Sequence, residues 1–397
     1  MHVRTTRAAL VAATAVALSA ALVAPAVATP SGTGHAATRA AAEAVVEAGV
    51  PGVTVTARDG RGGWSATPGV GRIGTGKPRS ADDRYRVGSI TKTFVATVLL
   101  QLEAEGRLSL DDTVEKWLPG LVRGNGHDGR RITLRQLLNH TSGVYDYTAD
   151  DGFVRDHFMK DGFLEHRYDT KRPGELVAVA MRHEPQFAPG ARWSYSNTNY
   201  VLAGLVVEKA TGHPYGSEVE RRIIRPLRLT ATSVPGTRVT MPRPGSRAYG
   251  KLAETATGPT YDVTELNPSI AYAAGEMISD SKDLDRFYTA LLRGRLLPRE
   301  QLNEMTTTVP AVANVRYGLG LMRVELSCGV TVWGHGGGIH GSVSDVAVTR
   351  DGRHALALNL NGDWAGGTEA VVEAEFCGED AGAAAAGRVH RSLPGLR

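Results

Sequence analysis

The chain contains 397 residues, of which 42% are hydrophobic and 22% are charged, and its formal net charge is +4. These proportions are typical of a globular protein and exclude a mainly disordered chain, and the length allows one large core or two subdomains. The basic balance does not indicate nucleic-acid binding, because no basic run or aromatic platform accompanies it.

The N-terminus has the pattern of a secretory signal peptide. Arg4 and Arg7 precede an apolar, alanine-rich run, and a small-x-small cleavage motif follows at 26–28. The run is shorter than the ~20 residues that span a membrane, so a membrane anchor fits less well. We expect residues 1–28 to be removed, the protein to be secreted and extracellular without stable membrane insertion, and residues 29–39 to form a flexible leader.

The first predicted elements after this leader are a helix and a strand. Residues 40–50 are expected to be helical, and the β-branched residues of 52–57 end at the hairpin signal Asp59-Gly60. The glycine-rich stretch 69–77 matches parts of two nucleotide-binding fingerprints. It does not open a helix directly after a strand, so we interpret it as a β connection and exclude nucleotide binding.

A helix with a serine at its start is the centre of the chemical prediction. Apolar residues recur at helical spacing from Ile90 to Glu105, and Gly106 ends the pattern. Ser89 therefore lies at the positive end of a helix dipole. Lys92 lies on the same face and can take the hydroxyl proton if desolvation lowers its pKa. Taken alone, this pair favours an ordinary capped surface helix over a nucleophile.

The middle of the chain is predicted to be mainly helical. A short helix capped by Thr133 is followed by helices over 170–183 and 199–210. The stretch 230–267 is irregular, and a further helix over 281–292 is capped by its first residue.

The C-terminal part is predicted to be strands closed by one helix. The expected strands, with a tight turn between the last two, are 317–325, 329–333, 342–349 and 354–360. Residues 368–376 form the closing helix, and 378–397 are expected to be a disordered tail.

Strand signals at both ends and helices between them indicate an α+β fold. We expect an antiparallel sheet flanked by helices, with a mainly helical insertion. The domain should span 40–377, with its sheet part built from 40–105 and 272–377 and the insertion over about 106–271.

The only two cysteines are Cys328 and Cys377. In an exported chain a single pair is most simply one disulfide, and the alternative is two free buried thiols. The sequence has no C-x-x-C motif, no His-Glu-x-x-His motif and no clustered Asp and His residues, so we expect neither a metal nor a cofactor.

Three short motifs stand in the order found in a known hydrolase family. They are Ser89-x-x-Lys92, Tyr195-Ser196-Asn197 and His335-Gly336-Gly337. With them the chain resembles the serine penicillin-recognising hydrolases, and it looks most like secreted D-alanyl-D-alanine carboxypeptidases, with class C β-lactamases and related esterases more distant. The resemblance runs from about 40 to 377 and includes the cysteine pair and the stretches 87–89, 139–143, 195–199 and 317–321.

The resemblance implies an acyl-enzyme mechanism. Ser89 would attack the substrate carbonyl, and Tyr195 would move the proton if Lys92 and His335 lower its pKa from about 10. Asn197 would hold the substrate amide through its side chain. The alternatives are a core role for Tyr195 and a structural turn role for His335.

The resemblance also implies how the substrate is held. The backbone N–H groups of Ser89 and Gly338 would form an oxyanion hole, and Gly337 with its neighbours would let an edge strand approach the substrate. Expected ligands are small peptides or peptidoglycan stem peptides, with β-lactams as covalent ligands, and we expect a monomer. The alternatives are a β-lactamase or esterase of the same fold, or a binding protein that is acylated without turnover. His340 has no matching role and is interpreted as structural.

The sequence departs from the carboxypeptidases where those relatives grip the terminal carboxylate. They carry an arginine and hydroxyl residues there, whereas this chain has Met322, Gly336 and Gly338. A tryptophan common near the cleft corresponds to Ile270, and Arg323 should face away if its neighbour faces the substrate. The leaving group stays open between D-alanine, an internal D-residue and an ester alcohol. We expect weak activity on peptides ending in D-Ala-D-Ala, and better activity on amidated or esterified substrates. Class C β-lactamases would also differ, because they use lysine at the position of the histidine in the third motif.

Overall fold

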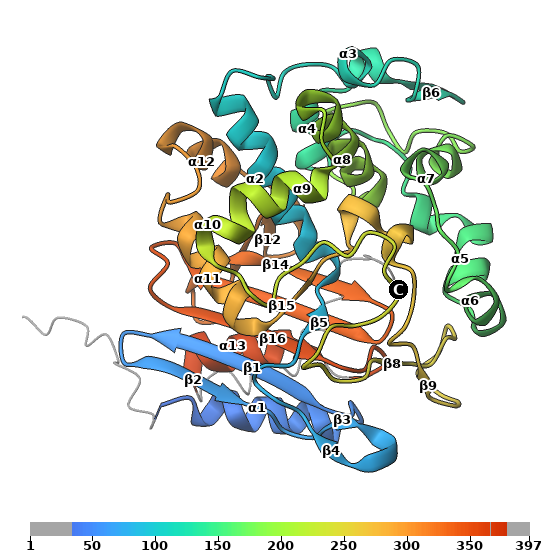
Figure 1. Ribbon diagram of the computed structural model, residues 1–397. Coiled ribbons are helices and arrows are strands. Elements are labelled where there is room, and N and C mark those ends of the chain that lie inside the picture. The colour runs from blue at the N-terminus through green and yellow to red at the C-terminus, as the bar shows by residue number, and fades with distance from the viewer. Residues whose placement is uncertain (1–33, 366, 379–397) are drawn as a thin grey trace, which may run out of the picture. The chain divides into compact units, whose positions relative to one another are not determined.

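The computed structural model describes residues 34–365 and 367–378, and it confirms the predicted mixture of helices and antiparallel strands (Figure 1). The predicted signal peptide, the first part of the predicted leader and residues 379–397 of the predicted tail lie outside the described residues.

An eight-stranded antiparallel sheet joins the two ends of the domain. Its order is β11-β12-β13-β14-β15-β16-β1-β2. The strand bounds are β1 (Val53–Asp59), β2 (Gly62–Ala66), β11 (Val309–Val312), β12 (Val315–Tyr317), β13 (Met322–Glu325), β14 (Thr331–Ile339), β15 (Ser342–Thr349) and β16 (Ala355–Leu360). Because Val53 of β1 pairs with Leu360 of β16, the N-terminal hairpin completes a sheet that is otherwise C-terminal.

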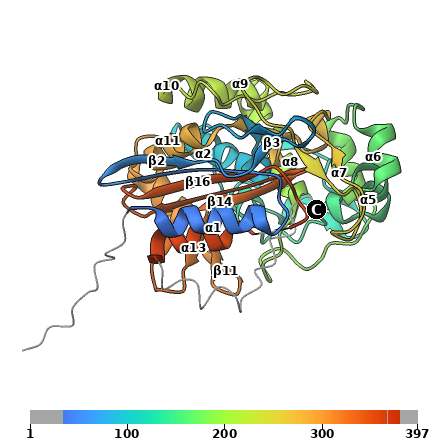
Figure 2. The ribbon, with the colours of Figure 1, turned by 90° about the horizontal axis from the view of Figure 1, so that it is seen from below.

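Helices cover both faces of this sheet. Helices α1 (Ala36–Glu47) and α13 (Glu369–Cys377) lie side by side on one face, while α2 (Thr91–Ala104) and α11 (Ser281–Leu292) lie on the other (Figure 2). Successive side chains of β16 point to opposite faces of the sheet. Ala357 belongs to the core under α2 and α11, whereas Leu358 belongs to the core under α1 and α13.

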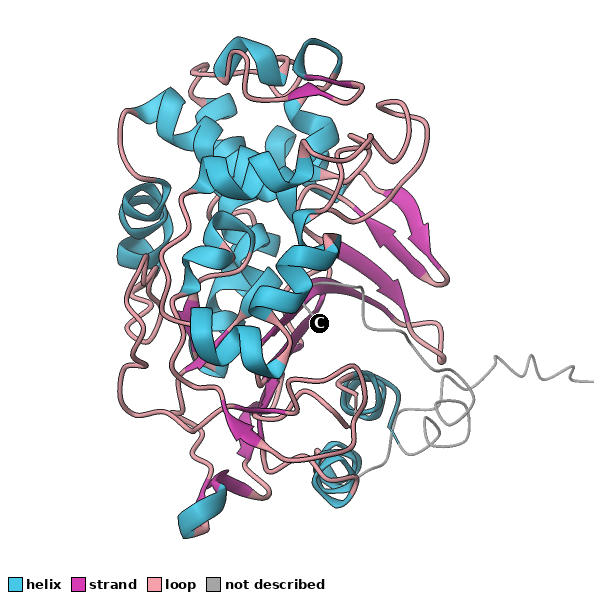
Figure 3. Cartoon of the chain, turned by 90° about the vertical axis from the view of Figure 1, so that its right-hand side faces the viewer, coloured by secondary structure: helices cyan, strands magenta, loops and turns pink. Residues whose placement is uncertain are grey.

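The other helices gather on the α2 side of the strands (Figure 3). Their bounds are α3 (Val114–Trp117), α4 (Leu134–Leu138), α5 (Asp151–His157), α6 (Lys160–His166), α7 (Pro173–Ala180), α8 (Asn197–Thr211), α9 (Tyr215–Val219), α10 (Arg225–Leu227) and α12 (Arg299–Thr306). Short strand pairs complete the fold: β3 (Val70–Arg72) with β4 (Lys77–Pro78), β5 (Tyr85–Arg86) with β10 (Ile278–Ser279), β6 (Arg123–Gly124) with β7 (His127–Asp128), and β8 (Tyr249–Gly250) with β9 (Tyr261–Asp262). None of the helices in the described ranges is both long enough and apolar enough to cross a membrane.

A disulfide between Cys328 and Cys377 confirms the predicted pairing. It ties the end of α13 to the loop between β13 and β14, across a sequence separation of 49. In the chain-entropy account, closing a loop of this length stabilises the folded state by about 4 kcal/mol.

Three predicted boundaries are wrong. Helix α1 begins at Ala36 rather than at 40, within the expected flexible leader, because Thr38 is buried and donates a hydrogen bond to Glu375 of α13. The strand predicted over 317–325 is two strands, β12 and β13, separated by a turn in which Gly320 has a φ of +66°. Helix α11 is capped by Asp280, whose side chain accepts from a backbone N–H, and not by its first residue.

The strand that carries the third motif is longer than predicted. The strand expected over 329–333 continues as β14 to Ile339, so His335 and the three glycines after it are strand residues, as the edge-strand role of the glycines requires. Beyond Gly334, β14 pairs with β15 but no longer with β13. This free edge of β14 faces the start of α2.

Candidate active site

Ser89 and Lys92 meet at the start of α2, as the sequence predicts. Ser89 lies in a single 3₁₀ turn, Gly88–Ile90, that leads into the helix, and only 3% of it is exposed. The Lys92 Nζ is 2.9 Å from the Ser89 Oγ. Both side chains are therefore held away from bulk water, in contact with each other.

The surroundings of Lys92 favour its neutral amine. Its Nζ lies 2.8 Å from the Asn197 Oδ1 and 2.7 Å from the Ala274 carbonyl oxygen. Burial lowers the Lys92 pKa well below 10.5, and the nearby Asp146 opposes that shift. The two oxygens only accept hydrogen bonds, so a neutral amine gives both of its N–H groups to them. The nitrogen lone pair is then left for the Ser89 hydroxyl.

Tyr195 lies beside Lys92. It precedes α8, is 6% exposed, and its ring centroid is 4.8 Å from the Lys92 Nζ. Burial raises the Tyr195 pKa above 10.0, although the Ser89 side chain opposes the shift. The expectation that this pKa is lowered is therefore wrong, because desolvation of the phenolate outweighs the neighbouring groups.

Asn197 forms hydrogen bonds at both ends of its side chain. Its Oδ1 accepts from Lys92, and its Nδ2 lies 3.2 Å from both the Asp146 Oδ2 and the Thr148 Oγ1. Asp146 also accepts from the Asn197 backbone N–H at 3.1 Å. The Asn197 side chain therefore links Lys92 to a buried carboxyl group, and its contact with a substrate amide stays a prediction.

Two glycines bring the edge of β14 against the nucleophile. A Cβ on Gly337 would lie 2.0 Å from the Val87 carbonyl oxygen and 3.0 Å from the Ser89 nitrogen. Gly88, with a φ of +52°, would place a Cβ 2.7 Å from the Gly338 nitrogen. Side chains at either position would push the two backbones apart, so the glycines permit the approach that an oxyanion hole at Ser89 and Gly338 requires.

His335 forms its side-chain hydrogen bonds with groups other than Tyr195. Its Nε2 is 2.8 Å from the Tyr317 hydroxyl, and its Nδ1 is 2.5 Å from the Gly336 carbonyl oxygen. Burial lowers the His335 pKa to about 3, so the ring is neutral and brings no positive charge to Tyr195. The predicted role of His335 in lowering that pKa is wrong, since both ring nitrogens are engaged elsewhere.

The other predicted positions differ in how they relate to the site. Met322 packs with Tyr195 and Tyr317 in an apolar cluster beside the catalytic groups. Arg323 turns away, with its guanidinium 3.4 Å from the Thr331 hydroxyl, as strand alternation predicts. Ile270 is buried in the main core, where its carbonyl oxygen accepts from a tyrosine hydroxyl, and among the described residues no hydrogen bond joins it to Ser89.

Sequence reasoning missed the residues that support the site. His140 and Tyr317 belong to stretches that carry the resemblance, but the sequence assigns them no role, and it gives no signal for Asp146 or Ala274. The signal for His140 was its place in the motif over 139–143, but nothing in the motif shows which side chains it touches. Those contacts join elements that are far apart in the sequence and meet only in the folded protein.

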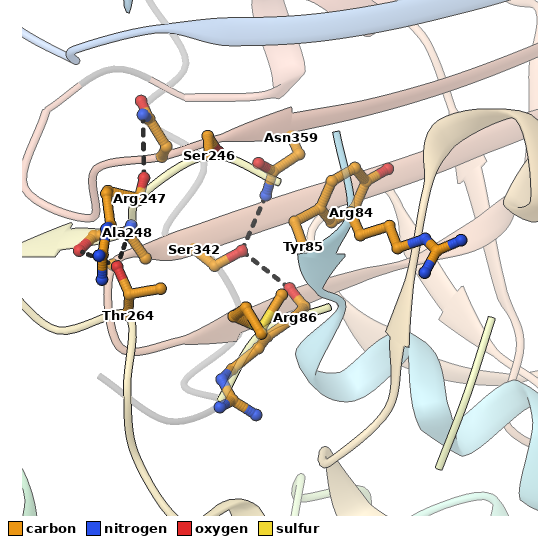
Figure 4. Close-up of a pocket in the computed structure, with 12 residues that line it drawn as sticks. Arg84, Tyr85, Arg86, Ser246, Arg247, Ala248, Thr264, Ser342 and Asn359 are labelled. Atoms are coloured by element: carbon orange, nitrogen blue, oxygen red, sulfur yellow. Dashed lines mark hydrogen bonds between the residues drawn. The ribbon is translucent and has the colours of Figure 1, made fainter. Parts of the chain in front are cut away.

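Two cavities lie away from the serine. One of about 10 Å³ is lined by residues that include Arg86, Ser342 and Asn359, and Figure 4 shows the Asn359 side chain reaching the Ser342 hydroxyl. The other, of about 230 Å³, is lined by a set that includes Arg84 and Arg238. Ser89 lines neither cavity, so the site is defined by its hydrogen bonds and by the half-buried glycines 336–338. In 34–365 and 367–378, no group of three or more His, Cys, Asp or Glu side chains is placed to hold a metal.

Comparison with known proteins agrees with this geometry. The sequence profile of the family described as Beta-lactamase matches residues 35–371. A D-stereospecific amidohydrolase from Streptomyces sp. is 66% identical and superposes with a TM-score of 0.83, over 87% of this chain and 99% of the other. A D-amino acid amidase from Ochrobactrum anthropi SV3, complexed with L-phenylalanine amide, is 30% identical with a TM-score of 0.73, over 85% and 95%.

Similarity extends to penicillin-binding proteins. Penicillin-binding protein 4* of Bacillus subtilis (strain 168) is 30% identical over 226 residues, which are 54% of this chain and 46% of that protein. The chain spans about half the length of the first curated relatives it matches. The profile match over most of the chain, together with the fold and the serine–lysine pair, shows that this protein belongs to the β-lactamase family and has the β-lactamase fold.

Proposed function

We propose that this protein hydrolyses amides and esters of D-amino acids through an acyl-enzyme on Ser89. The observation that carries the choice of substrate is Met322. The related carboxypeptidases are expected to hold a carboxylate-binding arginine at this position, and here an apolar side chain packs against Tyr195. The neighbouring Arg323 turns to the other face. A substrate without a free carboxylate fits this environment better, because an unpaired carboxylate is costly to desolvate.

The names of two relatives support the stereochemical part. One is described as a D-stereospecific amidohydrolase and another as a D-amino acid amidase. The D-alanyl-D-alanine carboxypeptidase activity implied by the sequence resemblance is a second candidate, and the similarity to penicillin-binding proteins favours β-lactams as covalent ligands. Export to the extracellular space and a monomeric state remain part of the proposal.

In the proposed acylation, neutral Lys92 takes the Ser89 hydroxyl proton as the Oγ attacks the substrate carbonyl carbon. The backbone N–H groups of Ser89 and Gly338 stabilise the oxyanion. Protonation of Lys92 places a positive charge near Tyr195, which favours the phenolate and makes the phenol a stronger acid at that moment. Tyr195 then donates its proton to the leaving amine, the carbon–nitrogen bond breaks, and Tyr195 is reprotonated at the expense of Lys92.

Deacylation runs the same groups in reverse. A water molecule gives its proton to the Tyr195 and Lys92 pair as its oxygen attacks the ester carbon. The bond from carbon to the Ser89 Oγ breaks, the Oγ takes up a proton, and the D-amino acid leaves. One amide bond and one water molecule are consumed in each cycle.

The proposed function is tested by measuring kcat/KM of one protein preparation on three substrates: D-phenylalanine amide, L-phenylalanine amide and a peptide that ends in D-Ala-D-Ala. We expect kcat/KM on D-phenylalanine amide to exceed that on its L enantiomer by at least about 100-fold, which corresponds to about 2.7 kcal/mol. A peptide ending in D-Ala-D-Ala with a free carboxylate should be a poorer substrate than the D-amide, and Ser89→Ala should lack all three activities. Equal rates on the enantiomers, or a preference for the free-acid peptide, would contradict the proposal.

A further inference from the structure

A chain of buried hydrogen bonds crosses the site between its helical side and its sheet side. The His140 Nε2 is 3.3 Å from the Tyr317 hydroxyl, and that hydroxyl is 2.8 Å from the His335 Nε2. All three side chains are buried. Neither His140 nor Tyr317 has a role in the proton transfers described above, so their place beside the catalytic groups requires a separate explanation.

The chemistry of the neighbours fixes the hydrogen positions at the sheet end. The His335 Nδ1 faces the Gly336 carbonyl oxygen at 2.5 Å, and a carbonyl oxygen only accepts, so the Nδ1 carries hydrogen. Because burial keeps this ring neutral, its Nε2 carries none. That Nε2 must then accept, and its partner is the Tyr317 O–H.

The same reasoning gives the opposite tautomer at the helical end. The His140 Nδ1 lies 3.2 Å from the backbone nitrogen of Ser196 and 3.2 Å from the amide nitrogen of Asn199, and both of these groups donate. The Nδ1 therefore carries no hydrogen. Burial lowers the His140 pKa well below 6.5, so the ring is neutral and its Nε2–H donates to the Tyr317 oxygen.

The hydrogen bonds therefore all donate in one direction, from His140 to Tyr317, from Tyr317 to His335, and from His335 to the Gly336 carbonyl oxygen. His140 also holds both sides of Tyr195. Its carbonyl oxygen accepts from the Ser194 N–H at 3.0 Å, its ring accepts from the Ser196 N–H, and the two ring centroids of His140 and Tyr195 are 4.3 Å apart.

The other end of the chain lies on the β14 edge that approaches the nucleophile. His335 and Gly336 precede Gly337, whose backbone packs against Val87 and the Ser89 nitrogen. The hydrogen-bond chain therefore connects the segment that carries the proposed proton donor to the strand that carries the proposed oxyanion hole.

We infer that His140 and Tyr317 are positioning residues, which hold Tyr195 in register with the β14 edge through a directional hydrogen-bond chain of two oppositely protonated neutral histidines. This inference rests on the proposed roles of Ser89 and Tyr195. The backbone of His140 fits a dedicated position, since it adopts a φ of +61°, which few side chains other than those of Asn, Asp and His accept readily.

The first test reads the tautomers without any substrate. Nitrogen chemical shifts of full-length protein labelled with ¹⁵N-histidine should show His140 protonated on Nε2 and His335 protonated on Nδ1, with assignments from His140→Asn and His335→Asn. In Tyr317→Phe the Nε2 signals of both rings should shift, because each loses its partner. The same tautomer at both positions, or a charged ring at either, would overturn the inference.

The second test separates positioning from general stability. Tyr317→Phe removes one buried oxygen, and we expect kcat on D-phenylalanine amide to fall about 10- to 100-fold, with KM changed less than about threefold. Tyr85→Phe is the matched control, because the buried Tyr85 hydroxyl pairs with the Ser281 hydroxyl at 2.8 Å, away from the chain. Its kcat should stay within about twofold of wild type.

Equal kcat values in the two variants, at equal thermal stability, would overturn the positioning role. The two tests also distinguish this inference from the proposed function. If the tautomers are as expected but the wild-type protein does not turn over D-amides, the proposed substrate is wrong and the hydrogen-bond chain stands. If turnover is as proposed but the tautomers differ, the inferred hydrogen-bond chain is wrong and the proposed function stands.

Discussion

At the scale of single residues, the site depends on burial, which lowers the pKa of Lys92 and raises the pKa of Tyr195. Burial favours the neutral form of Lys92, which makes it a base, and the protonated form of Tyr195, which makes it an acid. The two groups therefore begin the reaction in complementary protonation states, and neither needs a charged histidine nearby.

The first prediction concerns the phenol. Tyr195→Phe should lower kcat by about 10²- to 10⁴-fold while KM changes little, because the hydroxyl is needed when the leaving group takes its proton. Steady-state kinetics on D-phenylalanine amide measures both constants. Turnover close to that of wild type would assign the proton transfer to Lys92 alone.

The second prediction concerns substrate choice. Met322→Arg should raise kcat/KM on a free-acid D-Ala-D-Ala peptide by about 10- to 150-fold, since a charge-assisted hydrogen bond to a carboxylate contributes roughly 1.5–3 kcal/mol. The C-terminal amide of the same peptide is the matched substrate and should gain nothing. A wild-type enzyme that already prefers the free acid a hundredfold would show that another residue supplies the cation.

At the scale of elements, local signals predicted what neighbouring residues alone decide. Thr133 caps α4, Pro173 opens α7 and Gly212 ends α8, as the sequence predicts. These features are predictable because caps and turns depend on a few adjacent side chains. The turn that divides the strand predicted over 317–325 could not be predicted in this way. A Cβ on Gly320 would lie 2.7 Å from Ala96 of α2, so this turn is fixed by long-range packing.

The third prediction concerns the contact that fixes the start of α1. The Glu375 carboxylate of α13 receives hydrogen bonds from His35 and Thr38, beside and within α1, and from His354, at 2.9, 2.6 and 2.6 Å. Burial alone would raise the Glu375 pKa, but these bonds outweigh it and leave the pKa below 4.5. A carboxyl group with a lowered folded-state pKa stabilises the fold above its unfolded pKa and loses that contribution as pH falls through the folded value.

Glu375→Gln should therefore reduce the free energy of unfolding by about 1–3 kcal/mol at neutral pH, and the deficit should shrink as pH falls below 4.5. Denaturant melts at several pH values measure this. Glu43→Gln, an exposed substitution on α1, is the control and should be nearly neutral. A deficit that is constant with pH would show that the carboxylate charge is not involved.

At the scale of the whole molecule, the sequence predicted which segments meet but not how they touch. The resemblance placed Ser89, Tyr195 and His335 together, and the fold does bring the start of α2, the start of α8 and the free edge of β14 into one site. His335 contacts Tyr317, which also contacts His140, and Asn197 contacts Asp146. No rule of sequence spacing predicts these pairs.

The central claim is that Ser89 forms an acyl-enzyme, and intact-mass spectrometry after incubation with benzylpenicillin tests it most directly. The account predicts one covalent adduct on the wild-type protein, mapped by peptide digestion to the segment that contains Ser89, and none on Ser89→Ala. An adduct that persists in Ser89→Ala, or that maps to another residue, would contradict it.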